Sequence, residues 1–277
     1  VPLGPVAAIT PFNFPLNLAA HKIAPAIAAG DTVVWKPAST TPLTAVLLTE
    51  IMEDAGIPPG VVNLIFGPGS IAGEGLVASG DINLVSFTGS LEVGKMIRDI
   101  SGLRRTILEL GSNSAMVVDD DVDSIDDIIE RSMIGAYANA GQVCISIQRI
   151  YVHENIFDEF CSKFVVESKR VKVGNPIQDD VLYGPMITEK DAIRAEEWIE
   201  KAIKQGAKPL LKGERRDSVI TPTVLTDVTF DMDVVSKEVF APVVSIMPYS
   251  DFSQAIEMVN NSIYGLNAGI FTSDIKK

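Results

Sequence analysis

The chain has 277 residues, 47% hydrophobic and 21% charged, which suffices to bury the core of one large or two modest domains. This composition excludes a disordered, a collagen-like and a coiled-coil protein. The formal net charge is −13. It argues against a general nucleic-acid-binding protein, because neutralising phosphates requires clustered Lys and Arg. It also argues against attachment to anionic membranes.

Cysteine and histidine are scarce. The two cysteines, Cys144 and Cys161, cannot build a disulfide framework, which favours a reducing, cytoplasmic location. No Cys or His pairs stand at metal-ligand spacing, so no metal site is expected. The uncharged stretches 1–20 and 55–73 are interrupted by Pro and Gly, and indicate neither a spanning helix nor a signal peptide. Since both ends of the chain lie close to strand-like runs, we expect a piece of a longer protein.

Short β-branched runs alternate with helical stretches in the first part of the chain. Strands are predicted over residues 6–10, 32–36, 61–66, 82–87 and 106–110. Helices are predicted over residues 17–29, 42–55, 70–79 and 91–100. Strands that are apolar on both faces and separated by helices are typical of parallel sheets with right-handed crossovers. The pattern predicts a doubly wound α/β layer.

The same alternation continues in the second part. Strands are predicted over residues 115–118, 149–153, 223–225, 243–248 and 268–271, and helices over 124–140, 156–171 and 189–205, with a polar loop at 175–185. The Gly-Ser-Asn-Ser segment 111–114 is the best candidate boundary. We therefore predict two domains, 1–111 and 112–277, each a doubly wound, mostly parallel α/β layer, with an active-site cleft between them.

Cys144 follows a predicted helix in the segment Gly141-Gln142-Val143-Cys144. Because Gly141 allows a sharp turn, the thiol could lie at the mouth of a cleft as a nucleophile. A lone cysteine is also, and more commonly, a small buried hydrophobic residue. Cys161, which follows Phe160 on the apolar side of a predicted helix, is expected in the core.

Asn13 lies in the loop Pro11-Phe12-Asn13-Phe14-Pro15, directly after the first strand. The carboxyl ends of parallel strands are where α/β sheets bind ligands. A rigid amide there could donate to a developing oxyanion, or it could serve only as a turn residue that bonds its own backbone.

Glu109 interrupts the apolar run at the end of the last strand of the first domain. A carboxylate among apolar residues would be desolvated, which suits a general base. A paired structural carboxylate is an equally good interpretation.

The segment Phe87-Thr88-Gly89-Ser90 follows a strand and opens a helix, where glycine lets a ligand approach and the helix N-terminus favours phosphate. The run from Gly89 is close to a P-loop, but Met96 stands where that motif has its magnesium-binding hydroxyl, which weakens an NTPase interpretation.

Two further segments could contact a nucleotide. Lys36 ends the second strand and could bond ribose hydroxyls, although a solvated surface lysine is the commoner case. Glu238 and Phe240 stand two apart on a segment predicted to be extended, so both side chains would point the same way. They could hold a ribose or a polar ring, or pack at a surface.

The order and spacing of these motifs resemble the aldehyde dehydrogenase superfamily along essentially the whole chain. The resemblance is carried by segments shared in sequence order, namely Pro11–Pro15, Lys36-Pro37, Phe87–Ser90, Glu109-Leu110-Gly111, Gly141–Cys144, Glu238–Pro242 and Tyr264-Gly265-Leu266.

The resemblance implies NAD(P)-dependent oxidation of a small-molecule aldehyde to a carboxylic acid. It assigns Cys144 as the nucleophile, Asn13 as an oxyanion donor and Glu109 as the base that activates water. It implies that NAD or NADP is contacted by the residues Thr10, Pro11, Phe12, Lys36, Ser39, Phe87, Thr88, Gly89, Ser90, Gly111, Glu238 and Phe240. A homo-oligomer, dimer or tetramer, is implied for the full-length protein.

One departure from the family pattern bears on the cofactor. The family often has Glu where this chain has Ser39. Without that carboxylate, repulsion against a 2′-phosphate is removed, which permits NADP. Val143 and Ile145 flank Cys144 without charge and offer no anchor for an anionic substrate. Two alternatives stay open: an aldehyde dehydrogenase that acylates coenzyme A, and a noncatalytic homologue or fragment.

Overall fold

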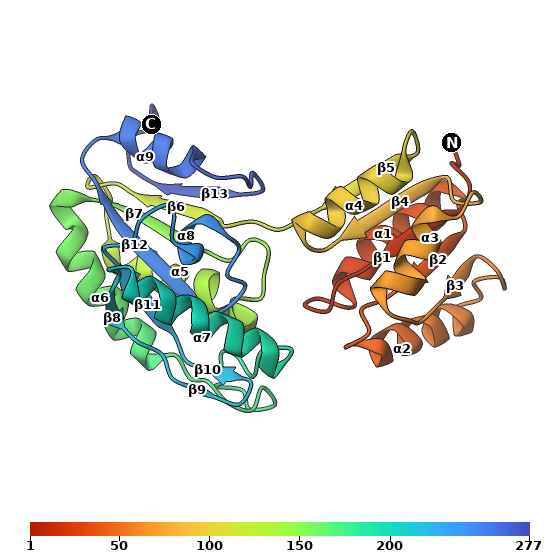
Figure 1. The fold of residues 1–277 in the computed structure, drawn as a ribbon, viewed down its shortest axis with the longest axis horizontal. Helices are drawn as coiled ribbons and strands as arrows, with labels where there is room; N and C mark the ends of the chain where they lie inside the picture. The colour runs from red at the N-terminus through yellow and green to blue at the C-terminus, as the bar shows by residue number, and fades with distance from the viewer. The chain divides into compact units, whose positions relative to one another are not determined.

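The computed structural model describes residues 1–277 (Figure 1). The chain divides into two compact units, Val1–Gly111 and Ser112–Lys277. Each unit has its own sheet, so each is described by itself.

The first unit is built on five parallel strands in the order β3-β2-β1-β4-β5. The strands are β1 Val6–Ile9, β2 Val33–Lys36, β3 Val62–Leu64, β4 Leu84–Thr88 and β5 Arg105–Glu109. The helices are α1 Asn17–Ala29, α2 Pro42–Asp54, α3 Glu74–Ala78 and α4 Leu91–Ser101. The predicted helix over 70–79 is instead a π-helical turn, η1 Gly69–Gly73, followed by α3.

Alternation along β1 explains why helices cover both faces of this sheet. Val6 and Ala8 pack in one core cluster with residues of α1 and α2, whereas Ala7 and Ile9 pack in another with residues of α3 and α4. Because successive strand residues point to opposite faces, a strand that is buried throughout needs cover on both sides. The predicted doubly wound layer is confirmed for this unit.

The second unit has six strands in the order β13-β6-β7-β12-β11-β8. They are β6 Ala115–Val118, β7 Arg149–His153, β8 Lys208–Leu211, β11 Thr223–Thr226, β12 Val243–Tyr249 and β13 Ala268–Phe271. All pairs are parallel except β8 with β11, which makes the sheet mostly parallel, as predicted. A separate short hairpin pairs β9 Arg215–Arg216 with β10 Val219–Ile220.

The helices of the second unit are α5 Ile125–Tyr137, α6 Phe157–Arg170, α7 Glu189–Lys204, α8 Asp233–Ser236 and α9 Phe252–Asn260, with short 3-10 turns at η2 Ala138–Gly141 and η3 Glu154–Ile156. None of these helices, nor those of the first unit, combines the length and the apolar character that a bilayer-spanning segment requires.

The sequence-based prediction differs from the structure at several elements of the second unit. The predicted helix over 124–140 ends at Tyr137, because Asn139 and Ala140 have φ values of 53° and 58° and leave the helical region. The antiparallel edge strand β8, the β9–β10 hairpin and the helices α8 and α9 were not predicted. Apart from α9 they are only two to four residues long, and strand β8 includes Pro209, so their local patterns are weak. Helix α9 does carry a local signal, because the Asp251 side chain caps its N-terminus.

Helix α6 anchors the core of the second unit through aromatic side chains. Phe160 and Phe164 are fully buried, with ring centroids 5.7 Å apart. The Phe164 ring also lies 6.4 Å from that of Tyr137 at the end of α5. These contacts join the two helices that flank the Cys144 segment on the chain.

Replacing Phe164 with alanine should lower the free energy of unfolding by about 3–5 kcal/mol, because it leaves a cavity among aromatic rings. Urea titration of the full-length protein measures the change. Val166→Ala on the exposed side of the same helix should change it by less than about 0.5 kcal/mol. Equal effects of the two substitutions would contradict the burial of Phe164 between α5 and α6.

Candidate functional site

Cys144 is half-buried in a tight turn that follows three left-handed residues. Asn139, Ala140 and Gly141 have φ values of 53°, 58° and 69°. Gly141 lies so close to another segment that a Cβ atom there would come within 2.3 Å of the Ala241 carbonyl oxygen. Glycine is therefore required at this position for two reasons, its backbone conformation and its close packing.

The Gln142 side chain stabilises this turn through two hydrogen bonds. Its side-chain Nε2 donates to the Asn139 carbonyl oxygen at 3.0 Å, and its Oε1 accepts from the Ile187 amide at 2.9 Å. The side chain is buried, so both bonds are shielded from water. Sequence reasoning missed this role, since nothing local marks Ile187 as a partner.

Cys161 is buried on α6, as expected. Burial, with a smaller contribution from the Asp158 charge, raises the pKa of its thiol to about 12. A thiol with that pKa is not ionised near neutral pH and is a poor nucleophile.

Glu238 and Phe240 lie on the irregular segment between α8 and β12. The Ser112 amide donates to Glu238 Oε1 at 3.0 Å, and the Glu238 amide donates to the Tyr264 hydroxyl at 3.3 Å. The segment is not extended as predicted, because Phe240 has a φ of 51°. Both side chains are half-buried and flank Val239, which is fully buried.

In the first unit, the candidate residues after β1 and β4 lie where the winding of the sheet reverses. Strand β1 pairs with both β2 and β4. Thr10 follows β1, and its hydroxyl accepts from Trp35 Nε1 at 2.9 Å. It leads into Pro11, Phe12 and Asn13, all partly buried. Such a switch point is where open α/β sheets bind ligands.

The segment at the end of β4 has the features of a phosphate-binding turn. The Ser90 side chain caps α4 by accepting from the Val93 amide at 3.3 Å. A Cβ atom on Gly89 would meet the ring of Phe87 at 2.4 Å. The Thr88 hydroxyl oxygen is buried and has no hydrogen-bond partner in the chain. Gly111, the last residue of the unit, is partly buried.

Lys36 is buried at the end of β2, so the surface-lysine interpretation is wrong. Its ammonium donates to the Pro37 carbonyl oxygen at 3.0 Å. Desolvation lowers the pKa of Lys36. Three residues on, Ser39 is exposed, and its hydroxyl donates to the Gly67 carbonyl oxygen at 3.2 Å.

Glu109 differs from the prediction that its carboxylate is desolvated. The side chain is exposed, because β5 is the edge strand of its sheet. Apolar neighbours along a chain do not bury a residue when no further strand covers the edge.

Lys22 is a charged residue that sequence reasoning missed. It lies on the buried face of α1, and its ammonium donates to the Ser86 hydroxyl at 3.3 Å. Burial lowers the pKa of Lys22 to about 8, although the negative charge of Glu109 acts in the opposite direction. The burial of Lys22 could have been predicted from the sequence, because Lys22 shares a helix face with Ala19, Ile23 and Ala26.

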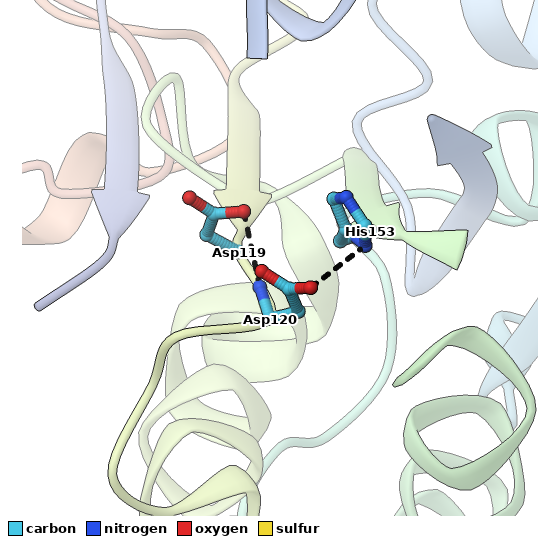
Figure 2. Close-up of side chains that lie close together, drawn as sticks. All are labelled: Asp119, Asp120 and His153. Carbon is cyan, nitrogen blue, oxygen red and sulfur yellow. Dashed lines mark hydrogen bonds and ion pairs between the residues drawn. The ribbon is translucent and has the colours of Figure 1, made fainter. Parts of the chain in front are cut away.

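A second polar cluster lies at the carboxyl edge of the second sheet, where Asp119, Asp120 and His153 point toward one another (Figure 2). His153 Nδ1 lies 3.4 Å from Asp120 Oδ2. The buried Asp119 carboxylate accepts from the Tyr249 hydroxyl at 3.1 Å and pairs with the Lys277 ammonium. Its charge is therefore compensated within the chain.

Lys22→Met should raise the free energy of unfolding at pH 7 by about 1–2 kcal/mol, because a buried ammonium is removed. The pKa of Lys22 is lower in the folded chain, so wild-type stability should gain from this group as pH rises from about 8 to 10.5. Denaturant titrations of the full-length protein at pH 7, 9 and 10 should show the wild-type and variant curves converging. Parallel curves would contradict the lowered pKa.

The comparisons with known proteins agree with these motifs. The model of the aldehyde dehydrogenase family matches residues 1–277. A 3-sulfolactaldehyde dehydrogenase from Priestia aryabhattai is 48% identical over all of this chain and 58% of its own length. A lactaldehyde dehydrogenase from Methanococcus aeolicus is 44% identical over all of this chain and 60% of its own.

Solved structures agree as well. The glyceraldehyde-3-phosphate dehydrogenase GapN of Methanocaldococcus jannaschii, complexed with NADP, has a TM-score of 0.96 and 42% identity over 99% of this chain and 60% of its own. The betaine aldehyde dehydrogenase of Staphylococcus aureus, in complex with NAD+, has a TM-score of 0.94 and 37% sequence identity. The match covers 99% of this chain and 56% of that protein's chain. The chain thus spans about 60% of the length of GapN. It belongs to the aldehyde dehydrogenase family.

Proposed function

We propose that the whole protein oxidises an aldehyde to a carboxylic acid with NAD or NADP, and that Cys144 is its nucleophile. The observation that carries the proposal is the half-buried Cys144 shortly after three consecutive left-handed residues, in a chain of this family. Backbone strain of this kind clusters at functional sites. The domains follow the two units, with the first proposed to bind the cofactor and the second to carry the nucleophile.

The residues of the first unit fit a dinucleotide. The buried Thr88 hydroxyl without a partner lies beside Gly89, and the N-terminus of α4 begins at Ser90. Amide groups at such a terminus suit a pyrophosphate. The Lys36 ammonium at the end of β2 would hold ribose hydroxyls, and Thr10, Pro11, Phe12, Phe87 and Gly111 would line the remainder. In the second unit, Glu238 and Phe240 would hold the nicotinamide end.

The chemistry assigned to this chain's residues begins at the Cys144 sulfur. Its thiolate attacks the aldehyde carbon, which places negative charge on the former carbonyl oxygen. The Asn13 amide and the Cys144 backbone N–H would donate to that oxygen. When bound, NAD(P)+ supplies the acceptor for the hydride that leaves this carbon, so that a thioester on Cys144 remains.

Glu109 would complete the reaction by taking a proton from water as that water attacks the thioester carbon. The C–S bond then breaks, the acid leaves and the thiolate of Cys144 is restored. Exposure of Glu109 suits this task, because the carboxylate must meet solvent water.

The relatives suggest the aldehydes to test. A lactaldehyde dehydrogenase and a 3-sulfolactaldehyde dehydrogenase are both similar to this chain, and both names point to short hydroxyaldehydes. We propose a short hydroxyaldehyde as the substrate. Because Val143 and Ile145 carry no charge, any anchor for an anionic group would come from elsewhere.

We propose a homo-oligomer for the full-length protein, located in the cytoplasm. Apolar side chains near α4 and β5, including Val93, Leu103 and Ile107, are exposed and suit contacts between subunits. The scarcity of cysteine suits a reducing compartment.

Cys144→Ala should abolish aldehyde oxidation by the full-length protein, whereas Cys161→Ala should leave turnover nearly unchanged. Lactaldehyde is mixed with NAD or NADP, reduced cofactor is followed by absorbance, and the product is identified by mass spectrometry. An acid formed from water supports the proposal, and an acyl-coenzyme A formed only with added coenzyme A would support the acylating alternative. Oxidation that persists in Cys144→Ala would refute the assigned nucleophile.

Ser39→Glu should shift the ratio of kcat/KM values toward NAD by about tenfold, or ~1.4 kcal/mol, because a carboxylate would repel a 2′-phosphate. Wild-type protein should use NADP at least as well as NAD. Ser39→Gln is the matched control, since it adds the same length without charge. A strong preference of the wild-type protein for NAD would contradict the role proposed for Ser39 in cofactor choice.

A further inference from the structure

The segment that carries Glu238 has no helix or strand to fix its backbone. It runs between α8, which ends at Ser236, and β12, which begins at Val243. Its backbone includes the left-handed Phe240. Buried backbone groups outside regular structure need hydrogen-bond partners from turns, side chains or water.

One side chain bonds two backbone groups of this segment and one of α8. Gln148 Nε2 donates to the Val234 carbonyl oxygen at 3.0 Å and to the Lys237 carbonyl oxygen at 2.6 Å. Gln148 Oε1 accepts from the Val239 amide at 2.9 Å. Two of the bonded residues, Lys237 and Val239, stand immediately on either side of Glu238.

Gln148 is itself firmly held. Its side chain is buried, its amide donates to the Ser114 carbonyl oxygen at 3.1 Å, and its carbonyl oxygen accepts from the Ser245 amide at 2.9 Å. A primary amide offers two donors and an acceptor, which is what two carbonyls and one N–H require. Asparagine is one methylene shorter, and glutamate lacks the donors.

The same stretch of chain carries the nucleophile. Gln148 follows Cys144 by four positions, and Gly141 packs directly against the Ala241 carbonyl. Arg194 adds a bond from the other side, since its Nη2 donates to the Val239 carbonyl oxygen at 2.9 Å. Segments 139–148 and 234–242 are therefore joined at two places within one unit.

We propose that Gln148 is a positioning residue that fixes the Glu238 carboxylate, and through it the cofactor ribose, relative to the Cys144 turn. The inference rests on the proposed function, in which Glu238 contacts the cofactor. Gln148 touches neither cofactor nor substrate and acts only through the backbone on either side of Glu238.

The test is a double-mutant cycle on the full-length protein, read by the fluorescence of bound NADPH and by melting temperature. Gln148→Met keeps the length of the side chain and removes all three bonds. It should raise the Kd for NADPH about tenfold in the wild-type background and by less than about twofold in Glu238→Gln. Near-complete non-additivity is the signature of a residue that acts through Glu238.

Tyr249→Phe is the matched structural control. It removes hydrogen bonds to Asp119 and to the Val118 carbonyl at the carboxyl end of β12, far along that strand from Glu238. It should lower the melting temperature and leave the Kd for NADPH unchanged. Should Gln148→Met fail to fold, Gln148→Glu keeps the acceptor for Val239 and loses the donors, and it should weaken NADPH binding in the same way.

The outcomes separate this inference from the proposed function. An unchanged Kd in both Gln148 variants, additive effects with Glu238→Gln, or an equal effect of Tyr249→Phe would overturn the role of Gln148 while wild-type oxidation stands. Wild-type protein that binds neither NADPH nor NADH would overturn both. Binding without aldehyde oxidation would refute the proposed reaction, and the cycle would still decide the role of Gln148.

Discussion

Parallel pairing of β1 with strands on both of its sides is the constraint on which the cofactor half of the proposed site depends. Because β1 is buried on both faces, the helices that follow it and its neighbours must cover opposite sides of the sheet. The chain after β1 and the chain after β4 then leave in different directions. The Thr88 hydroxyl at this place is buried and has no hydrogen-bond partner in the chain.

In the second unit, hydrogen bonds from buried side chains, and not strand pairing, hold the segments that carry the candidate residues. Cys144 precedes β7 and Glu238 precedes β12, so both lie near the amino ends of parallel strands. The carboxyl edge instead holds the cluster of Asp119, Asp120 and His153 (Figure 2). The Tyr249 hydroxyl and the Lys277 ammonium compensate the charge of Asp119 there. Irregular segments at the amino edge cannot rely on strand pairing, and buried side-chain amides, Gln142 and Gln148, supply their hydrogen bonds.

The sequence predicted most helices and strands because two-sided apolar strands and capped helices are local patterns, as at Ser124 before α5. It identified the motif residues through their order along the chain. It could not identify Gln148, whose side-chain partners are 86 to 91 positions away. It misjudged Glu109, because whether an apolar strand lies at a sheet edge depends on strand order. Lys22 could have been found from its helix face alone.

The turn before Cys144 contains strained residues where glycine would adopt the same backbone conformation without strain. Asn139 and Ala140 adopt left-handed backbone conformations that cost about 1 kcal/mol or more each for a residue with a Cβ atom. Glycine would remove that cost but would leave more conformations open to the unfolded chain. The bonds of Gln142 to Asn139 and Ile187 offset the strain. For the nucleophile proposed at Cys144, such a fixed backbone would leave little further freedom to lose when a substrate binds, which would favour attack in one defined direction.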